Sequence, residues 1–117
     1  LQRGRQRAEE REAQALLAAA QARKDSAANE LLAQLGEQWA ALAAARHIES
    51  LTRTRLLPQA SLTLQAALVG YETGQVDFAT VLDALRQNRQ AQLDLINTRT
   101  EARIRAAEIE RLLGERP

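Results

Sequence analysis

The sequence has no cysteine and no methionine, and it contains only one residue each of Trp, Tyr and Phe. Without cysteine the chain can form neither a disulfide nor a thiolate metal site. The absence of cysteine does not indicate whether the protein resides in an oxidising or a reducing compartment. So few aromatic residues exclude a conventional globular core and a base-stacking surface. The formal net charge is +1, from 16 basic and 15 acidic residues. We therefore expect no attraction to nucleic acid.

Apart from these absences, the chain is a nearly uninterrupted run of helix-forming residues. From about residue 5 to residue 70 there is no strand-like alternation, and helix breakers are limited to Gly36 and Pro58. A helix of that length is stable only if it is packed along its side. Apolar residues at helical spacing predict such a seam at Ala13, Leu17, Ala20, Ala27, Leu31, Leu35, Leu42 and Ala45. Pro58 removes a backbone hydrogen bond, so we expect a kink at Thr54–Pro58 and not an end.

A second helix is predicted from about residue 77 to residue 113. Asp77 is a good N-cap, and Val76 before it can pack on Val81 as a hydrophobic staple. Gly74 supplies the positive φ of the reversal, and Gly114 followed by Pro117 stops the helix. Its heptad pattern predicts a seam at Val81, Leu85, Asn88, Gln92, Leu95, Arg99, Ala102, Ala106, Ile109 and Leu113.

The second helix carries a further partial apolar stripe beside this seam, at Phe78, Leu82, Leu93, Ile96, Ile104 and Ala107. Two stripes require two neighbours, whereas a simple hairpin offers one. The fold predicted for residues 1–117 is all-α: a long, lopsided antiparallel coiled-coil hairpin with its tip at residues 71–76. We expect the upper half of the first arm, from Arg5 to about Leu35, to be left without a partner in this hairpin. No signal peptide or membrane-spanning helix is expected in these residues, because the longest uncharged run, Leu56 to Tyr71, contains Pro, Gln, Ser and Thr.

The residues that could carry chemistry are sparse. His47 is the single histidine and is best explained as an ordinary surface or seam residue, so no transition-metal site, cofactor site or catalytic residue is expected. Glu72, Asp77 and Asp83 lie near the reversal, where acidic residues usually cap a helix or face solvent. Asp83 lies past the first turn, between Leu82 and Leu85. In an assembly of several hairpins it could instead contribute to a ring of carboxylates.

Three segments resemble the TolC-like outer membrane efflux protein family, also called outer membrane factors. YETGQVDFATVLDALRQNRQAQLDL, Tyr71 to Leu95, is similar to its second hairpin, with Tyr-x-x-Gly, a short spacer and an apolar run closing in Leu-Asp-Ala. LLPQASLTLQAA, Leu56 to Ala67, looks like the branch that serves heavy-metal and other resistance-nodulation-division pumps. AAEIERLLG, Ala106 to Gly114, is similar to the closing Leu-x-x-x-x-Gly signature. The first arm is only a generic match.

This resemblance implies that the chain is a fragment of the periplasmic α-helical barrel of a homotrimeric channel in the cell outer membrane. Contact with the membrane would be made only by a β-barrel outside the fragment. The channel would be a passive export duct for metal ions or drugs, joined to an inner membrane pump through a periplasmic adaptor. Tyr71, Gly74, Val76 and Asp77 would form the tip that meets the adaptor. Asp83, with Thr80, would lie at the channel entrance and govern ion selectivity.

Two positions depart from the family pattern, since well-known members carry an Arg where Val76 stands and an acidic residue where Thr80 stands. These departures imply a looser or less cation-selective aperture. Two other classes stay open from the residues alone. A free coiled-coil hairpin, such as an adaptor arm or a scaffold, would account for the helices, and a small helical enzyme would need a convergent polar cluster that the sequence does not offer.

Overall fold

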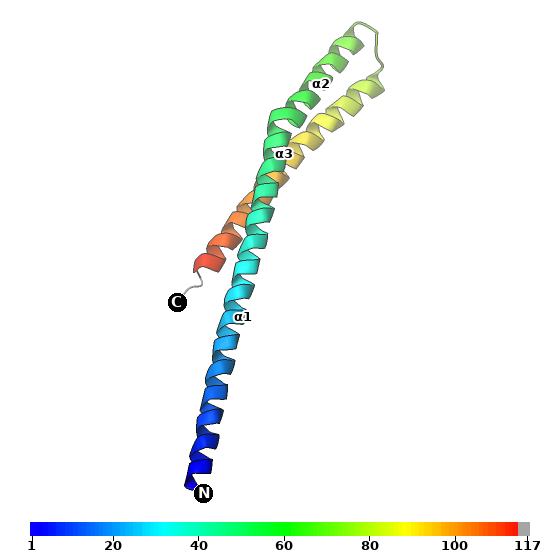
Figure 1. The fold of residues 1–117 in the computed structure, drawn as a ribbon. Helices are drawn as coiled ribbons and strands as arrows, with labels where there is room; N and C mark the ends of the chain where they lie inside the picture. Colours follow the sequence, from blue (N-terminus) through cyan, green and yellow to red (C-terminus); the bar gives the residue numbers. More distant parts are fainter. Residues whose placement is uncertain (115–117) are drawn as a thin grey trace. The chain divides into compact units, whose positions relative to one another are not determined.

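The computed structural model describes residues 1–114, and these residues form helices joined by one tight turn (Figure 1). Helix α1 spans Gln2–Leu51, a π-helical turn η1 spans Thr52–Leu56, α2 spans Leu57–Glu72 and α3 spans Phe78–Gly114. The described residues contain no strand. The predicted all-α hairpin is thus confirmed, and the helix bounds agree with those expected to within a few residues. Pro117, the predicted stop signal, lies outside the described residues.

The chain divides into two compact units, residues 1–37 and 38–117. The first unit is a single helical segment in which no residue is buried. The predicted seam residues Ala13, Leu17, Ala20 and Ala27 are all exposed there, while Leu31 and Leu35 are partly buried. A lone helix has no second surface against which an apolar stripe can pack, so this unit has helical structure without a core.

The second unit is the hairpin, in which the end of α1, η1 and α2 form one arm and α3 forms the other. On α3 the buried and partly buried side chains repeat at alternating intervals of three and four residues: Val81, Ala84, Asn88, Ala91, Leu95, Thr98, Ala102, Arg105, Ile109 and Leu112. These are the two inward positions of a heptad pattern. The side of α3 that packs is therefore rich in alanine.

Part of the predicted α3 seam is wrong by one residue. Val81, Asn88, Leu95, Ala102 and Ile109 lie where expected, and Ala106 is partly buried, as is Arg105 before it. At the other alternate positions the predicted residue is exposed and the residue before it is buried or partly buried: Ala84, Ala91, Thr98 and Leu112 in place of Leu85, Gln92, Arg99 and Leu113. The pair at the tip makes this plain, because Ala84 is 4% exposed and Leu85 is 50% exposed. Small side chains at the seam let the two backbones approach closely, and the larger Leu85 is left outside.

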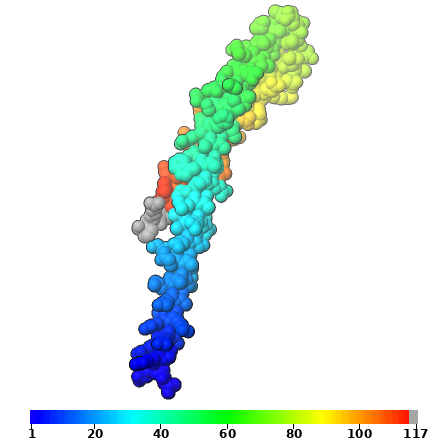
Figure 2. Space-filling view, in the orientation of Figure 1, coloured from blue at the N-terminus to red at the C-terminus, as the bar shows by residue number. Residues whose placement is uncertain are grey.

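Contacts between the arms extend from the tip at least as far as Arg105 on α3. Near the tip, Ala67, Val81 and Ala84 form a buried cluster against which Leu64 packs. The space-filling view shows α2 and the start of α3 in close contact there (Figure 2). Farther from the tip, Arg99 Nε donates to Glu49 Oε1 at 3.1 Å, and Arg105 Nη1 donates to Gln38 Oε1 at 3.3 Å. Farther from the tip, polar side chains thus bridge the arms beside buried apolar residues such as Leu42 and Ile109.

The first arm is irregular where a kink was expected, and the irregularity takes the form of the π-helical turn Thr52–Leu56. The Leu57 N–H donates to the Thr52 carbonyl, five residues back, and Pro58 follows in the first turn of α2. Proline has no N–H to give to the ladder, so the beginning of a new helical segment is where it costs least. The arm continues as helix through the turn.

Candidate functional site at the hairpin tip

The tip turn is held by backbone hydrogen bonds that converge on the end of α2. The Gly70 carbonyl accepts from the N–H groups of Gln75 at 2.7 Å and Val76 at 3.1 Å. The Thr73 N–H and hydroxyl both donate to the Val69 carbonyl, at 3.0 and 2.9 Å. Gly74 has a φ of 74°, as predicted, which is a conformation that residues with a Cβ rarely adopt. These bonds satisfy carbonyls that the end of a helix otherwise leaves without partners.

Gly70 has a second role at the tip, which the sequence reading missed. A Cβ placed on Gly70 would lie 3.0 Å from Val76 Cγ2 and 3.2 Å from Val76 Cγ1. Val76, expected to pack on Val81 as a staple, thus lies against the backbone of Gly70. On the apolar side of the turn, the rings of Tyr71 and Phe78 lie 5.9 Å apart at an angle of 58°. This tilted arrangement is favourable for an aromatic pair.

Asp77 caps α3 as predicted. Its Oδ1 accepts from the Thr80 N–H at 3.0 Å and from the Thr80 hydroxyl at 2.7 Å. The hydrogen bond from the Thr80 hydroxyl, followed by that from the Thr80 N–H, lowers the pKa of the Asp77 carboxyl below its usual value. Thr80 is therefore engaged in the cap.

Thr80 and Asp83 lie in one open groove along the tip half of the hairpin, which we call the tip groove. It has a volume of about 330 Å³ and is lined by Thr63, Ala66, Ala67, Val76, Thr80, Asp83, Ala84 and Gln87. The Asp83 carboxylate lies 3.7 Å from Arg86 Nη1, and both side chains are well exposed to solvent. A pair so exposed is weak, so Asp83 is free to meet an ion or another chain.

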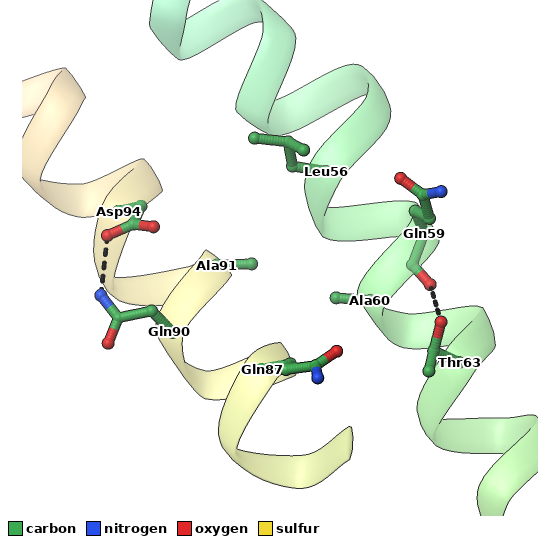
Figure 3. A pocket seen from close by; sticks show the side chains of 8 residues that line it. All are labelled: Leu56, Gln59, Ala60, Thr63, Gln87, Gln90, Ala91 and Asp94. Carbon is green, nitrogen blue, oxygen red and sulfur yellow. Dashed lines mark hydrogen bonds between the residues drawn. The ribbon is translucent and has the colours of Figure 1, made fainter. Parts of the chain in front are cut away.

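A second groove adjoins the tip groove and shares Thr63 and Gln87 with it; we call it the middle groove. Its volume is about 420 Å³, and Leu56, Gln59, Ala60, Gln90, Ala91 and Asp94 complete its lining. Figure 3 shows Ala60 and Ala91 facing each other between the two helices, with amide and carboxylate side chains around them. Gln90 Nε2 donates to Asp94 Oδ1 at 2.8 Å, which fixes part of this rim (Figure 3). Together the two grooves form a face with an alanine floor and a rim of amide, hydroxyl and carboxylate side chains, which we call the polar face.

The opposite side of the hairpin is different. Large apolar side chains are exposed on or beside this side of the hairpin: Phe78, Leu85, Leu93 and Ile96 of α3 and Leu68 of α2. Leu82 is partly buried on the same stripe. A shallow depression between the helices on this side is lined by Leu64, Leu85, Asn88, Arg89 and Gln92. We call this the apolar face. Most of the second stripe predicted from the sequence lies on it and is exposed.

The structure thus separates the predicted tip residues into two groups. Val76, Thr80 and Asp83 line the tip groove, with Asp77 bonded to Thr80. Tyr71 lies with Phe78 toward the apolar face, and Gly74 lies within the turn between α2 and α3. A glycine directly before the Tyr-x-x-Gly sequence was the available signal for Gly70, but nothing in the sequence connected it with Val76.

Within residues 1–114 no group of three or more His, Asp or Glu side chains is arranged to hold a metal ion. Over the same residues, no helix combines the length and the apolar character needed to cross a membrane. Comparison of the chain with protein-family models, with curated proteins and with solved structures found no match.

Proposed function

We propose that this hairpin is one wall segment of the periplasmic helical duct of a TolC-like outer membrane efflux channel. The observation that carries the proposal is the presence of two unlike lateral faces beside the seam. A free hairpin needs one apolar seam, and this one has, in addition, an exposed apolar face opposite an alanine-floored polar face. Hairpins arranged side by side in a closed ring would cover one kind of face with the other.

The chemistry of the two faces supports that arrangement. Leu85, Leu93 and Ile96 project from the apolar face, and Ala60, Ala84 and Ala91 leave room between the helices on the polar face. In coiled helices the side chains of one helix pack into holes between side chains of the next, and small residues such as alanine leave room for large ones. A homotrimer in which each chain supplies such hairpins follows from this proposal and from the sequence resemblance.

In this proposal the duct conducts passively, and the choice of exported metal ion or drug rests with the inner membrane pump. The periplasmic adaptor would meet the tip at Tyr71, Gly74, Val76 and Asp77. Asp83 would lie at the entrance, where a ring of carboxylates attracts cations and repels anions. Thr80 would add no charge to that ring, since it is neutral and its hydroxyl is bonded to Asp77. The proposed entrance is therefore less acidic than one with an acidic residue at this position.

The entrance is tested by conductance of the channel-forming protein in lipid bilayers. Asp83→Asn should weaken block by divalent cations several-fold, because each chain loses one carboxylate at the entrance. Asp94→Asn is the matched control, since Asp94 lies on the same face but is bonded to Gln90 farther from the tip. Cation block that is unchanged by Asp83→Asn would remove Asp83 from the entrance.

Self-association of this chain tests the two faces separately from the entrance. Sedimentation equilibrium should show association that weakens when Leu85 and Ile96 are both replaced by Gln, with helicity unchanged. The control is Leu17→Gln, an exposed leucine of the first unit. A strictly monomeric, cooperatively folded hairpin would favour the alternative of a free coiled-coil module, such as an adaptor arm or a scaffold.

A further inference from the structure

The two arms of the hairpin differ in how regularly their seams repeat. On α3 the alternation of three and four residues is unbroken from Val81 to Leu112. On the first arm it runs through Gln38, Leu42, Ala45, Glu49 and Thr52 and resumes at Leu57, Ala60, Leu64 and Ala67. Thr52 and Leu57 are five residues apart where the pattern requires four. The first arm therefore contains one extra residue.

Side-chain exposure locates the extra residue in the π-helical turn. An unbroken pattern would place Leu56 in the seam after Thr52, yet Leu56 is 46% exposed and Leu57 is partly buried in its place. Thr52, the last seam residue before the shift, is only 2% exposed. The hydrogen bond from the Leu57 N–H to the Thr52 carbonyl closes a turn with one residue more than an α-helical turn. Seam phase and hydrogen bonding thus identify the same turn.

One residue in an α-helix corresponds to a rotation of about 100° about the helix axis. If Thr52–Leu56 were regular α-helix, the segments before and after it could not both face α3. We propose that the π-helical turn is a one-residue phase insertion that keeps both halves of the first arm on a single seam. This inference does not depend on the proposed function.

Pro58 offers a competing cause, because a proline can loosen the preceding turn without any help from the seam. The two causes differ in what happens when the proline is removed. A turn held by the seam persists in Pro58→Ala, since both halves must still face α3. A turn held by the proline alone becomes regular helix, and one half of the arm leaves the seam.

Cross-linking distinguishes these causes, and the chain has no cysteine to interfere. One cysteine pair replaces Glu49 and Arg99, which contact each other on the α1 side of the turn. The other replaces Ala60 and Ala91, which face each other on the tip side (Figure 3). With a short thiol-specific cross-linker, both pairs should react as well in Pro58→Ala as in the parent chain. Loss of either cross-link in Pro58→Ala would overturn the proposal.

Single-residue deletions provide the second test. Deleting Arg53, which is exposed in the turn, removes the extra residue, so regular helix then satisfies the seam on both sides. Combined with Pro58→Ala, this deletion should shift the thermal unfolding midpoint by only a few degrees from that of Pro58→Ala alone. Deleting Asn97, which is exposed on α3 where no extra residue exists, should lower the midpoint by about 10 °C or more in the same background. Equal losses in the two deletion variants would also overturn the proposal.

Discussion

The two units of the chain have similar amino-acid compositions, but their side chains are buried to different extents. Both are built mainly from Ala, Leu, Gln and charged residues, and both are helical throughout except at the tip turn. Residues 1–37 contain no buried side chain, whereas the hairpin buries a seam that extends along the whole described length of α3. Helix propensity is thus alike in the two units, and only the hairpin itself contains two helical arms. Packing of one helix against another, and not composition, therefore supplies most of the stability of these helices.

The largest difference between the units should appear on removing a seam side chain. Ile109 is 5% exposed, so Ile109→Ala should lower the free energy of unfolding by about 2–4 kcal/mol through lost burial and a residual cavity. The control is Leu17, which is 72% exposed in the first unit. Leu17→Ala should change the free energy of unfolding by less than about 0.5 kcal/mol. Urea unfolding followed by circular dichroism measures both. Equal losses would show that burial does not distinguish the two units.

The same glycine substitution should have opposite signs in the two units. Gly70→Ala places a Cβ against both methyl groups of Val76, so it should destabilise the hairpin by about 1 kcal/mol. Gly36 has no atom within 4 Å of the corresponding position, so Gly36→Ala should stabilise its helix by up to about 1 kcal/mol. Thermal unfolding of the two variants gives the comparison. The double variant Gly70→Ala with Val76→Ala should recover most of the stability lost in Gly70→Ala. If it does not, the loss does not come from contact with Val76.

Removal of the α3 cap should have a smaller effect. Asp77→Ala leaves the Thr80 N–H without its partner and should lower the unfolding midpoint by a few degrees. Asp25→Ala in the first unit removes only an exposed contact with Gln21 and should leave the midpoint unchanged or slightly raised. An unchanged midpoint in Asp77→Ala would contradict the capping role.

The cap also predicts a pH dependence of definite sign. Because folding lowers the pKa of Asp77, its stabilisation is fully present above the unfolded-state pKa of about 3.9 and is lost as pH falls through the lower folded-state value. The difference in unfolding midpoint between the parent chain and Asp77→Ala should therefore shrink as pH falls below about 4. A difference that grows in acid would contradict the assignment.

The smallest effect is expected from the ion pair that bridges the arms. Arg99→Gln removes the contact with Glu49. Because the Arg99 side chain is half exposed and that of Glu49 is partly exposed, the free energy of unfolding should fall by about 0.5 kcal/mol or less. Arg5→Gln, which removes a fully solvated pair with Glu9 in the first unit, should have no measurable effect. Urea unfolding at low and high salt checks both, because the Arg99 contribution should diminish as salt screens it.

The sequence predicted the helices, the tip and the cap because those depend on local signals. Asp77 caps α3 through a residue three positions away, Gly74 sets the turn through its own backbone, and the Ala-rich heptads favour helix at each residue. The alternate seam positions were predicted incorrectly because Ala84 and Leu85 both fit three-four spacing, and the larger residue is the more apolar choice. Which of the two faces inward depends on how closely the arms approach, and that is a property of the pair of helices.

The π-helical turn and the groove were beyond a local reading for the same reason. Pro58 signalled an irregularity, but its form depends on keeping the segments before and after it in phase with α3. The grouping of Val76, Thr80 and Asp83 in one groove depends on how the tip turn places Val76 against Gly70. Contacts across the hairpin, rather than spacing along the chain, determine these features.

Hydrogen exchange measured along the whole chain by mass spectrometry, at a concentration where it is monomeric, separates packing from helix propensity as the source of helix stability. If packing against a partner stabilises these helices, the amides of the helices within residues 38–114 should exchange orders of magnitude more slowly than those of residues 2–37. Equal protection in the two units would contradict the account, because residues 2–37 would then be stable helix without a buried seam.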